Sequence, residues 1–219
     1  EARLFKEGRK VYGVRTPVTR KIARKYWKHL PANDAKRPYI KEKNEIFKIS
    51  EQLLLSGYHE PLTIAFQWAL DVKNQYSEED FAVFEKWLKK YVNNWASCDD
   101  LCCGAFGIFL YKYPKFLPNV FAWTKSRNRW MKRAAVVSLI YSLRRGKYLK
   151  QAFKTADALL TDKDDLVQKG YGWMLKEASR NYQKEVFNHV MKNKQMTPRT
   201  ALRYAVEKMP RSMQRKAMK

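Results

Sequence analysis

Apolar residues recur at intervals of three and four positions along almost the whole chain. This spacing is typical of helices that bury one face, whereas alternation with a period of two, which indicates half-buried strands, is hard to find. The pattern therefore predicts an all-α protein. The predicted helices span residues 17–30, 38–57, 61–72, 78–91, 99–113, 117–124, 129–143, 148–160, 165–181, 183–193 and 198–208.

Several of these predicted helices begin at a recognisable signal. The pairs Thr16-Pro17 and Thr197-Pro198 predict a Thr at the N-cap and a Pro at the first helical position. Ser77 is followed by three acids, which the positive end of a helix dipole favours in a first turn.

A weak internal repeat groups the predicted helices. The segments around Trp68, Ala134, Trp173 and Ala205 look like equivalent second helices of helix pairs. The later intervals between them fall within the roughly 30 to 45 residues of a two-helix repeat, and the first has room for two units. The repeat predicts an α-solenoid of HEAT-like antiparallel helix pairs, forming one domain over residues 1–219 with an extended concave face.

The charge of the chain points to its partner. Among 219 residues, 45 Lys and Arg stand against 21 Asp and Glu, a formal net charge of +24. Such an excess favours a polyanion, because nucleic acid relieves the self-repulsion and releases counter-ions on binding. At 45% hydrophobic residues the chain is no disordered basic tail.

The basic residues crowd against aromatic residues in the predicted inner helices, which favours a basic concave face that binds phosphates. A solvated basic surface is the alternative for any single residue. The set is Arg127, Arg129, Lys132, Arg133, Arg144, Arg145, Lys169, Lys176, Arg180, Arg199 and Arg203.

Cysteine and histidine follow no metal-binding pattern. The cysteines lie within six residues with no second group nearby, and the histidines are far apart, so reduced thiols and no metal or cofactor are expected. No apolar run reaches the roughly 18 residues of a membrane span, and residues 1–10 lack the apolar core of a signal peptide, so a cytoplasmic protein is expected. The residues are Cys98, Cys102, Cys103, His29, His59 and His189.

Two acids beside a tryptophan stand out in this basic chain. On a helix, Trp95 and Asp99 are four residues apart and share a face, whereas Asp100 is rotated by about 100°. The alternative is structural, with Asp99 as an N-cap or first-turn acid and Trp95 in the core. The spacing alone leaves both interpretations open.

Four short stretches, in their order and spacing, resemble one family. They are Gly13-Val14-Arg15-Thr16-Pro17 with Arg20, Trp95-Ala96-Ser97-Cys98-Asp99, Trp130-Met131-Lys132-Arg133-Ala134-Ala135, and Lys169-Gly170-Tyr171-Gly172-Trp173-Met174-Leu175-Lys176-Glu177. From near Ala2 to at least Glu207 the chain resembles the bacterial DNA alkylation repair glycosylases with HEAT-like repeats, the AlkD-like family. It departs from the family pattern at Ala96, where an acid is frequent, and at Leu4, beside Phe5, where an aromatic residue can stand.

The resemblance implies a glycosylase of base excision repair that acts on double-stranded DNA containing N3- or N7-alkylated purines. No lysine is evidently placed as a Schiff-base nucleophile, so a monofunctional hydrolase is expected rather than a lyase. A solenoid of this size needs no partner to fold, so a monomer is expected. The resemblance also implies that Asp99 is catalytic, that Trp95 and Trp173 contact the lesion and its sugar, and that Arg133 binds a phosphate. Their positions in the basic set add three phosphate-binding candidates, Lys132, Lys169 and Arg203.

The chemistry of such a site agrees with these residue types. An N3- or N7-alkylated purine is already a cationic leaving group, and its departure builds positive charge on the deoxyribose. A carboxylate such as Asp99 stabilises that charge and orients or deprotonates the attacking water. Indole faces attract cations, and Arg133 beside the acid would favour its ionised form.

Two other functions stay open at this stage. The first is a non-catalytic HEAT-like protein that binds damaged, bent or branched DNA through shape and charge. The second is a scaffold for an acidic protein partner. A carboxylate amid phosphate-binding residues argues against the first, and the two DNA-binding functions predict a steep fall of affinity with salt that the scaffold does not.

Overall fold

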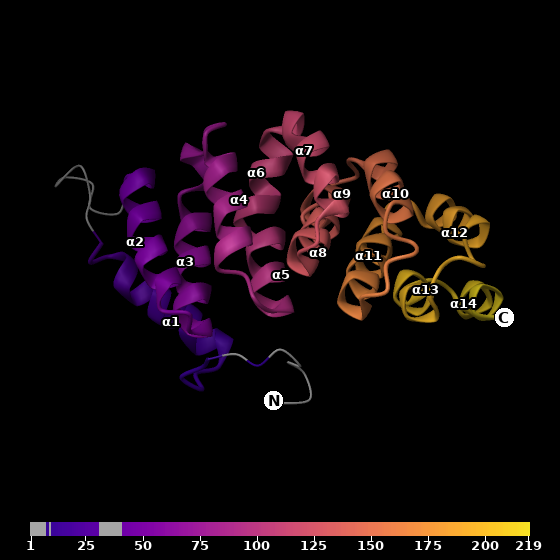
Figure 1. The fold of residues 1–219 in the computed structure, drawn as a ribbon, viewed down its shortest axis with the longest axis horizontal. Helices are drawn as coiled ribbons and strands as arrows, with labels where there is room; N and C mark the ends of the chain where they lie inside the picture. The colour runs from indigo at the N-terminus through magenta and orange to yellow at the C-terminus, as the bar shows by residue number, and fades with distance from the viewer. Residues whose placement is uncertain (1–7, 9, 31–40) are drawn as a thin grey trace. The chain divides into compact units, whose positions relative to one another are not determined.

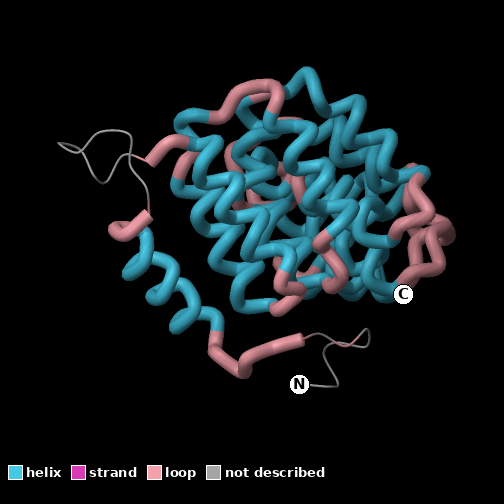
Figure 2. The backbone as a smooth tube through the Cα atoms, turned by 60° about the vertical axis from the view of Figure 1, so that its left-hand side comes forward, coloured by secondary structure: helices cyan, strands magenta, loops and turns pink. Residues whose placement is uncertain are grey.

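The computed structural model describes residue 8, residues 10–30 and residues 41–219. Every regular element in these residues is a helix (Figure 2), which confirms the predicted all-α class. Apart from the helices, one isolated bridge pairs Lys10 with Tyr58. The chain divides into two compact units, Glu1–Phe109 and Leu110–Lys219, which are described separately. The single domain and the concave face stay predictions.

Unit 1 is built around α3, which packs against α1, α2 and α5, and Figure 1 shows α2 and α3 side by side. The core of the unit is aromatic: five rings lie 5.4 to 5.9 Å from the ring of Phe84. The elements are α1 (Thr16–Trp27), α2 (Lys43–Leu55), α3 (His59–Asp71), the 3-10 turn η1 (Lys73–Gln75), α4 (Asp80–Lys90), α5 (Trp95–Cys103) and the first part of α6 (Ala105–Lys112).

The predicted helix 99–113 is wrong at both its start and its middle. Asn94 caps α5, because its side chain accepts a hydrogen bond from the backbone N–H of Ser97 at 3.0 Å. The chain leaves helical geometry at Gly104, whose ψ is −110°, and α6 follows. Asp99 therefore lies inside α5, and its interpretation as an N-cap or first-turn acid is wrong.

Unit 2 is built around α11, which packs against α8 and α13, neighbours that Figure 1 also shows. Gly172 permits the close approach of α13, because a Cβ there would lie 2.8 Å from the carbonyl oxygen of Ala201. The elements are the end of α6, η2 (Pro114–Phe116), α7 (Leu117–Ala122), η3 (Trp123–Lys125), α8 (Arg129–Val137), α9 (Ile140–Leu143), α10 (Leu149–Asp157), α11 (Asp165–Ala178), α12 (Gln183–Lys192), α13 (Arg199–Val206) and α14 (Arg211–Met218).

Other predicted boundaries need correction in unit 2. The helix expected over 129–143 is interrupted, since Leu139 donates to the carbonyl of Val136 in an i to i+3 bond that tightens the turn between α8 and α9. Helix α14 is not among the predicted helices; it is strongly polar, with three basic residues and few apolar ones. The N-cap expected at Thr197 is wrong, because its hydroxyl donates to the Asn193 carbonyl at 2.8 Å.

The start signals in unit 1 also differ from prediction. Thr16 is the first residue of α1 rather than its N-cap. Helix α4 begins only at Asp80, whose carboxylate accepts the backbone N–H of Ser77 at 2.9 Å, so Glu78 and Glu79 precede the helix and Asp80 alone of the three acids lies in its first turn. The first residues of the helix predicted over 38–57 lie outside the described residues, and α2 begins at Lys43.

None of the described helices combines the length and the apolar character needed to cross a lipid bilayer.

Candidate functional site

A small pocket of unit 1 is lined by the two acids of α5 together with side chains of α1 and α3. Its volume is about 230 Å³. Asp99 and Asp100 are both partly exposed there, and Trp95, also partly exposed, lies one helical turn before Asp99. The lining residues are Arg20, Phe66, Leu70, Asp99, Asp100, Cys103 and Gly104.

Asp100 has a defined partner in this pocket. Arg20 donates from Nη2 to Oδ1 of Asp100 at 2.6 Å and from Nη1 to Oε1 of Gln67 at 2.6 Å. Gln67 in turn donates from Nε2 to Oδ1 of Asp71 at 2.9 Å. These bonds form a continuous chain across α5, α1 and α3, which sequence reasoning missed although Arg20 belongs to the first family-like motif.

The electrostatics of Asp100 show opposing influences. Burial raises the pKa of the Asp100 carboxyl, the charge and hydrogen bond of Arg20 act to lower it, and the neighbouring charge of Asp99 acts to raise it, with a net rise. Two adjacent acids in one pocket repel each other when both are ionised. Burial and the charge of Asp99 therefore disfavour the ionised form of Asp100, and Arg20 favours it.

The motif before α1 is held in place by Glu60 of α3. The Glu60 carboxylate accepts the backbone N–H groups of Tyr12, Gly13 and Val14 at 3.0, 2.9 and 3.0 Å. Gly13 has a φ of +84°, a conformation that favours glycine. Although burial acts to raise it, the pKa of Glu60 is lowered by these hydrogen bonds. The clamp fixes the chain entering α1, the helix that carries Arg20.

In unit 2 the structure buries Arg133. Only 5% of the residue is exposed, and its Nη1 donates to the carbonyl oxygen of Leu166 at the start of α11. A Cβ on Gly170 would lie 3.5 Å from the Cγ of Arg133, so the small residue makes room for the side chain. Arg133 thus ties α8 to α11.

The other basic candidates of unit 2 differ in their partners. Lys132 pairs with Asp162 at 2.5 Å beside an open pocket of about 660 Å³, and Lys169 pairs with Asp165 at 3.0 Å. Arg203 on α13 is exposed, and the structure gives it no ion pair among the described residues.

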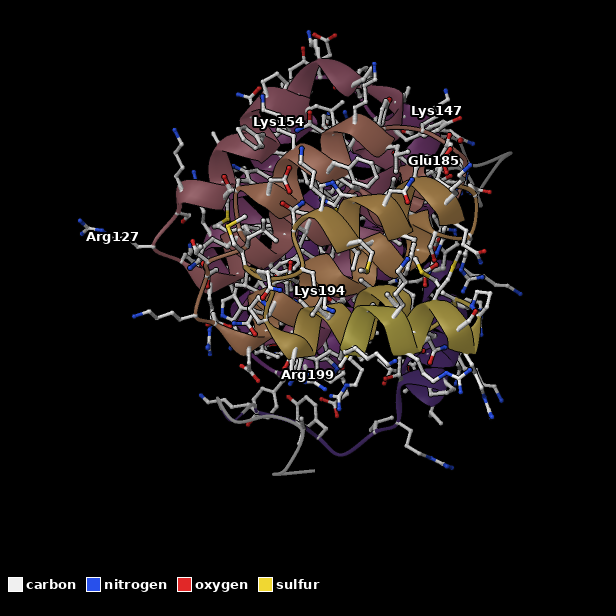
Figure 3. The ribbon with its side chains drawn as sticks, turned by 90° about the vertical axis from the view of Figure 1, so that its right-hand side faces the viewer. Arg127, Lys147, Lys154, Glu185, Lys194 and Arg199 are labelled. Atoms are coloured by element: carbon white, nitrogen blue, oxygen red, sulfur yellow. The ribbon has the colours of Figure 1, made fainter. Side chains whose placement is uncertain are left out.

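Figure 3 shows a similar contrast between two further cations of unit 2. Arg127, in the loop before α8, extends away from the ribbon. Lys154 instead lies over the ring of Phe121, with its Nζ 4.4 Å from the ring centroid. The basic side chains of this unit therefore differ widely in how available they are to a phosphate.

Trp173 of α11 is engaged with an acid of its own helix. Its Nε1 donates to Oε1 of Glu177 at 3.1 Å. The other oxygen of Glu177 binds Arg144 at 2.8 Å and Arg180 at 2.9 Å, and only 3% of Glu177 is exposed. Although burial acts to raise it, the pKa of Glu177 is lowered by Arg144, Trp173 and Arg180.

The structure thus places the predicted residues in two groups. Trp95 and Asp99 lie on α5 of unit 1. In unit 2, α8 carries Lys132 and Arg133, α11 carries Lys169 and Trp173, and α13 carries Arg203. Ala96 is partly exposed on α5, whereas Leu4 and Phe5 lie outside the described residues. Within the described residues no group of His, Cys, Asp and Glu could hold a metal ion.

Comparison with known proteins gives one family. The family model described as DNA alkylation repair enzyme matches residues 1–209. The fold is similar to that of a predicted DNA alkylation repair enzyme from Enterococcus faecalis, at 19% identity and a TM-score of 0.63, covering 94% of this chain and 99% of that one. It is also similar to smu.31 from Streptococcus mutans UA159, at 21% identity and a TM-score of 0.61, covering 89% and 96%. No curated protein matches the chain.

Proposed function

The chain belongs to the family of DNA alkylation repair enzymes, and from this premise we propose that it is a monofunctional DNA glycosylase of base excision repair. Its substrates are cationic N3- or N7-alkylated purines in intracellular duplex DNA, and it needs no metal. The observation that carries the proposal is the α5 pocket, where Asp99 lies beside an acid that is already paired with Arg20.

The reaction needs one ionised carboxylate. The glycosidic bond breaks with its electron pair going to the purine, which leaves as a neutral base, and positive charge develops on the sugar. The Asp99 carboxylate stabilises that charge, and the water that attacks C1′ passes its proton to Asp99 or to solvent. Because Arg20 compensates the charge of Asp100, that neighbouring charge opposes the ionised form of Asp99 less.

The tryptophans contact the lesion and its sugar. Trp95 lies one turn from Asp99 and is partly exposed. Trp173 is also partly exposed, and its N–H is directed to Glu177. Indole faces attract a cationic base and the polarised C–H bonds of a sugar.

Phosphate binding falls to basic residues of unit 2. Arg203 is exposed, whereas Lys132 and Lys169 must exchange Asp162 and Asp165 for a phosphate. For Arg133, which is buried, the support is the family-like motif alone. Such contacts position a duplex without reading its sequence.

The test is release of free base from duplex DNA containing N7-methylguanine under single-turnover conditions, comparing the native protein with Asp99→Asn and Asp100→Asn. Asp99→Asn is expected to lower the rate by about 10²-fold or more, as loss of a group that stabilises transition-state charge does, and to leave duplex affinity within a few-fold. Asp100→Asn, the matched control, is expected to lower it much less.

Two outcomes would contradict the proposal. Undiminished release by Asp99→Asn would remove the carboxylate from the mechanism. Release by the native protein no faster than the spontaneous reaction, together with tight and salt-sensitive duplex binding, would favour the non-catalytic protein that binds damaged DNA.

A further inference from the structure

The α5 pocket contains two adjacent carboxyl groups. Asp99 and Asp100 follow each other on one helix and both line the pocket. Ionising both places like charges together in a partly desolvated space, and the charge of Asp99 acts to raise the pKa of Asp100. An uncompensated charge on Asp100 would in the same way oppose the ionisation of Asp99, the carboxylate that the reaction needs.

Arg20 is placed to compensate the charge of Asp100. Its guanidinium has one N–H on Asp100 and another on Gln67, both at 2.6 Å, and 32% of its side chain is exposed. Gln67 is oriented for this contact, because its amide nitrogen donates to Asp71 and so its oxygen faces Arg20. The planar fork of arginine serves two acceptors at fixed positions, which the single ammonium of lysine does not.

The other described residues that line the pocket offer no second cation. The pocket presents Phe66 and Leu70 from α3, Cys103 from α5 and Gly104 after it, besides Asp99 and Arg20. Behind Gln67 stands the further acid Asp71. Arg20 is therefore the cation of the pocket-lining residues, and it is directed to Asp100.

We infer that Arg20 is a positioning residue for Asp99. By binding Asp100 and Gln67 it turns the second carboxylate toward α1 and compensates its charge, which would otherwise oppose the ionisation of Asp99, so that Asp99 meets the sugar as a carboxylate. This assignment rests on the proposed function. It concerns a residue that acts through Asp100 and does not itself need to touch DNA.

A double-variant experiment tests the assignment. Arg20→Met is expected to lower base release from the N7-methylguanine duplex by about tenfold or more at neutral pH, and to move the acid limb of the rate profile to higher pH. Asp100→Asn removes the charge that Arg20 compensates, so Arg20→Met/Asp100→Asn is expected to release base within a few-fold of Asp100→Asn alone. Arg20→Lys is expected to restore only part of the loss.

Arg24→Met is the matched control, because Arg24 is an exposed arginine one turn further along α1. It is expected to leave the pH profile unchanged. Thermal unfolding of each variant shows whether it is folded, and the Asp100→Asn background keeps the test decisive if Arg20→Met alone is unstable.

A different result would show that Arg20 binds DNA directly. If Arg20→Met lowers duplex affinity and reduces the salt slope by about one while the pH profile stays in place, Arg20 is a phosphate ligand and the inference is overturned. Equal losses in the presence and absence of the Asp100 carboxyl would overturn it as well.

A measurement without substrate separates this inference from the proposed function. Carbon-13 NMR titration of the Asp100 carboxyl in the DNA-free protein is expected to show a higher pKa in Arg20→Met than in the native protein or Arg24→Met. An unchanged titration overturns the inference whatever the enzyme does. Absence of base release by the native protein, with the titration shifted as expected, instead overturns the proposed function, and the catalytic consequence for Asp99 is overturned with it.

Discussion

Two helices of this protein carry a tryptophan followed four residues later by an acid, and the two pairs have different surroundings. In α11, Trp173 donates to Glu177, which is only 3% exposed and is bound by Arg144 and Arg180. In α5, Asp99 follows Trp95 and lines a pocket, and the arginine of that pocket binds the neighbouring Asp100.

The difference teaches that spacing identifies a shared helix face but not the task of the acid. Glu177 has two cations and an indole N–H on its oxygens, and its pKa is lowered, so its charge stabilises the fold of unit 2. Asp100 has one cation, stands beside another acid, and has a raised pKa because burial dominates. A carboxyl whose pKa is raised by burial beside a second acid is more typical of functional sites than of structural ion pairs.

The largest expected effect on stability lies at the α11 pair. Glu177→Ala is expected to lower the free energy of unfolding by about 2 kcal/mol, because a buried acid loses charged hydrogen bonds while both arginines, about half exposed, regain water. Asp99→Ala is expected to lower it by less, because Asp99 is partly exposed whereas Glu177 is buried. Urea denaturation of the two variants measures both.

Glu177→Gln serves as the control for size, since it retains an oxygen for Trp173 and removes only the charge. A loss in Asp99→Ala as large as that in Glu177→Ala would mean that the α5 acid is structural, and the contrast between the two helices would fail.

A smaller effect separates the two acids by the sign of their pH dependence. Because the folded-state pKa of Glu177 is lowered from 4.5, its stabilisation is present above that value and disappears as the pH falls through the folded-state pKa. The pKa of Asp100 is raised from 3.8, so its ionised form costs stability above that value, and acidification removes the cost.

The corresponding measurement is the free energy of unfolding between pH 3 and pH 7 for the native protein, Glu177→Gln and Asp100→Asn. Relative to the native protein, Glu177→Gln is expected to be less stable at pH 7 and to converge on it in acid. Asp100→Asn is expected to be at least as stable at pH 7, also converging in acid. Destabilisation by Asp100→Asn at pH 7 would show that the bond to Arg20 outweighs the cost of burial.

Local regularities carry most of what could be predicted from the sequence. Apolar periodicity predicts the helices, and the four-residue spacing of Trp95 and Asp99 predicts their common face, since both depend on neighbours within one or two turns. The break at Gly104 escapes the pattern because apolar residues continue with helical spacing on both sides of it.

Partners distant in sequence could not be predicted. Arg20 and Asp100 lie 80 residues apart, and Lys132 and Asp162 lie 30 apart, so only the packing of helices brings them together. The burial of Arg133 likewise depends on the space that Gly170 leaves in α11. A net charge of +24 counts cations, but it does not reveal which of them already have an acid beside them.

The smallest expected effect tests that last point in the phosphate-binding residues of unit 2. Each phosphate contact made by a free cation contributes about 0.9 to the slope of log affinity against log salt. Arg203 is exposed, so Arg203→Ala is expected to reduce the slope by about 0.9, whereas Lys132→Ala is expected to reduce it by less, because Asp162 already neutralises the ammonium. Asp162→Asn is expected to steepen the slope, since it releases Lys132 for a phosphate. Fluorescence anisotropy of a labelled undamaged duplex across a salt series measures all three slopes. Equal reductions by Arg203→Ala and Lys132→Ala would show that DNA displaces Asp162 from Lys132 at little cost. The ion pair would then not restrain the lysine.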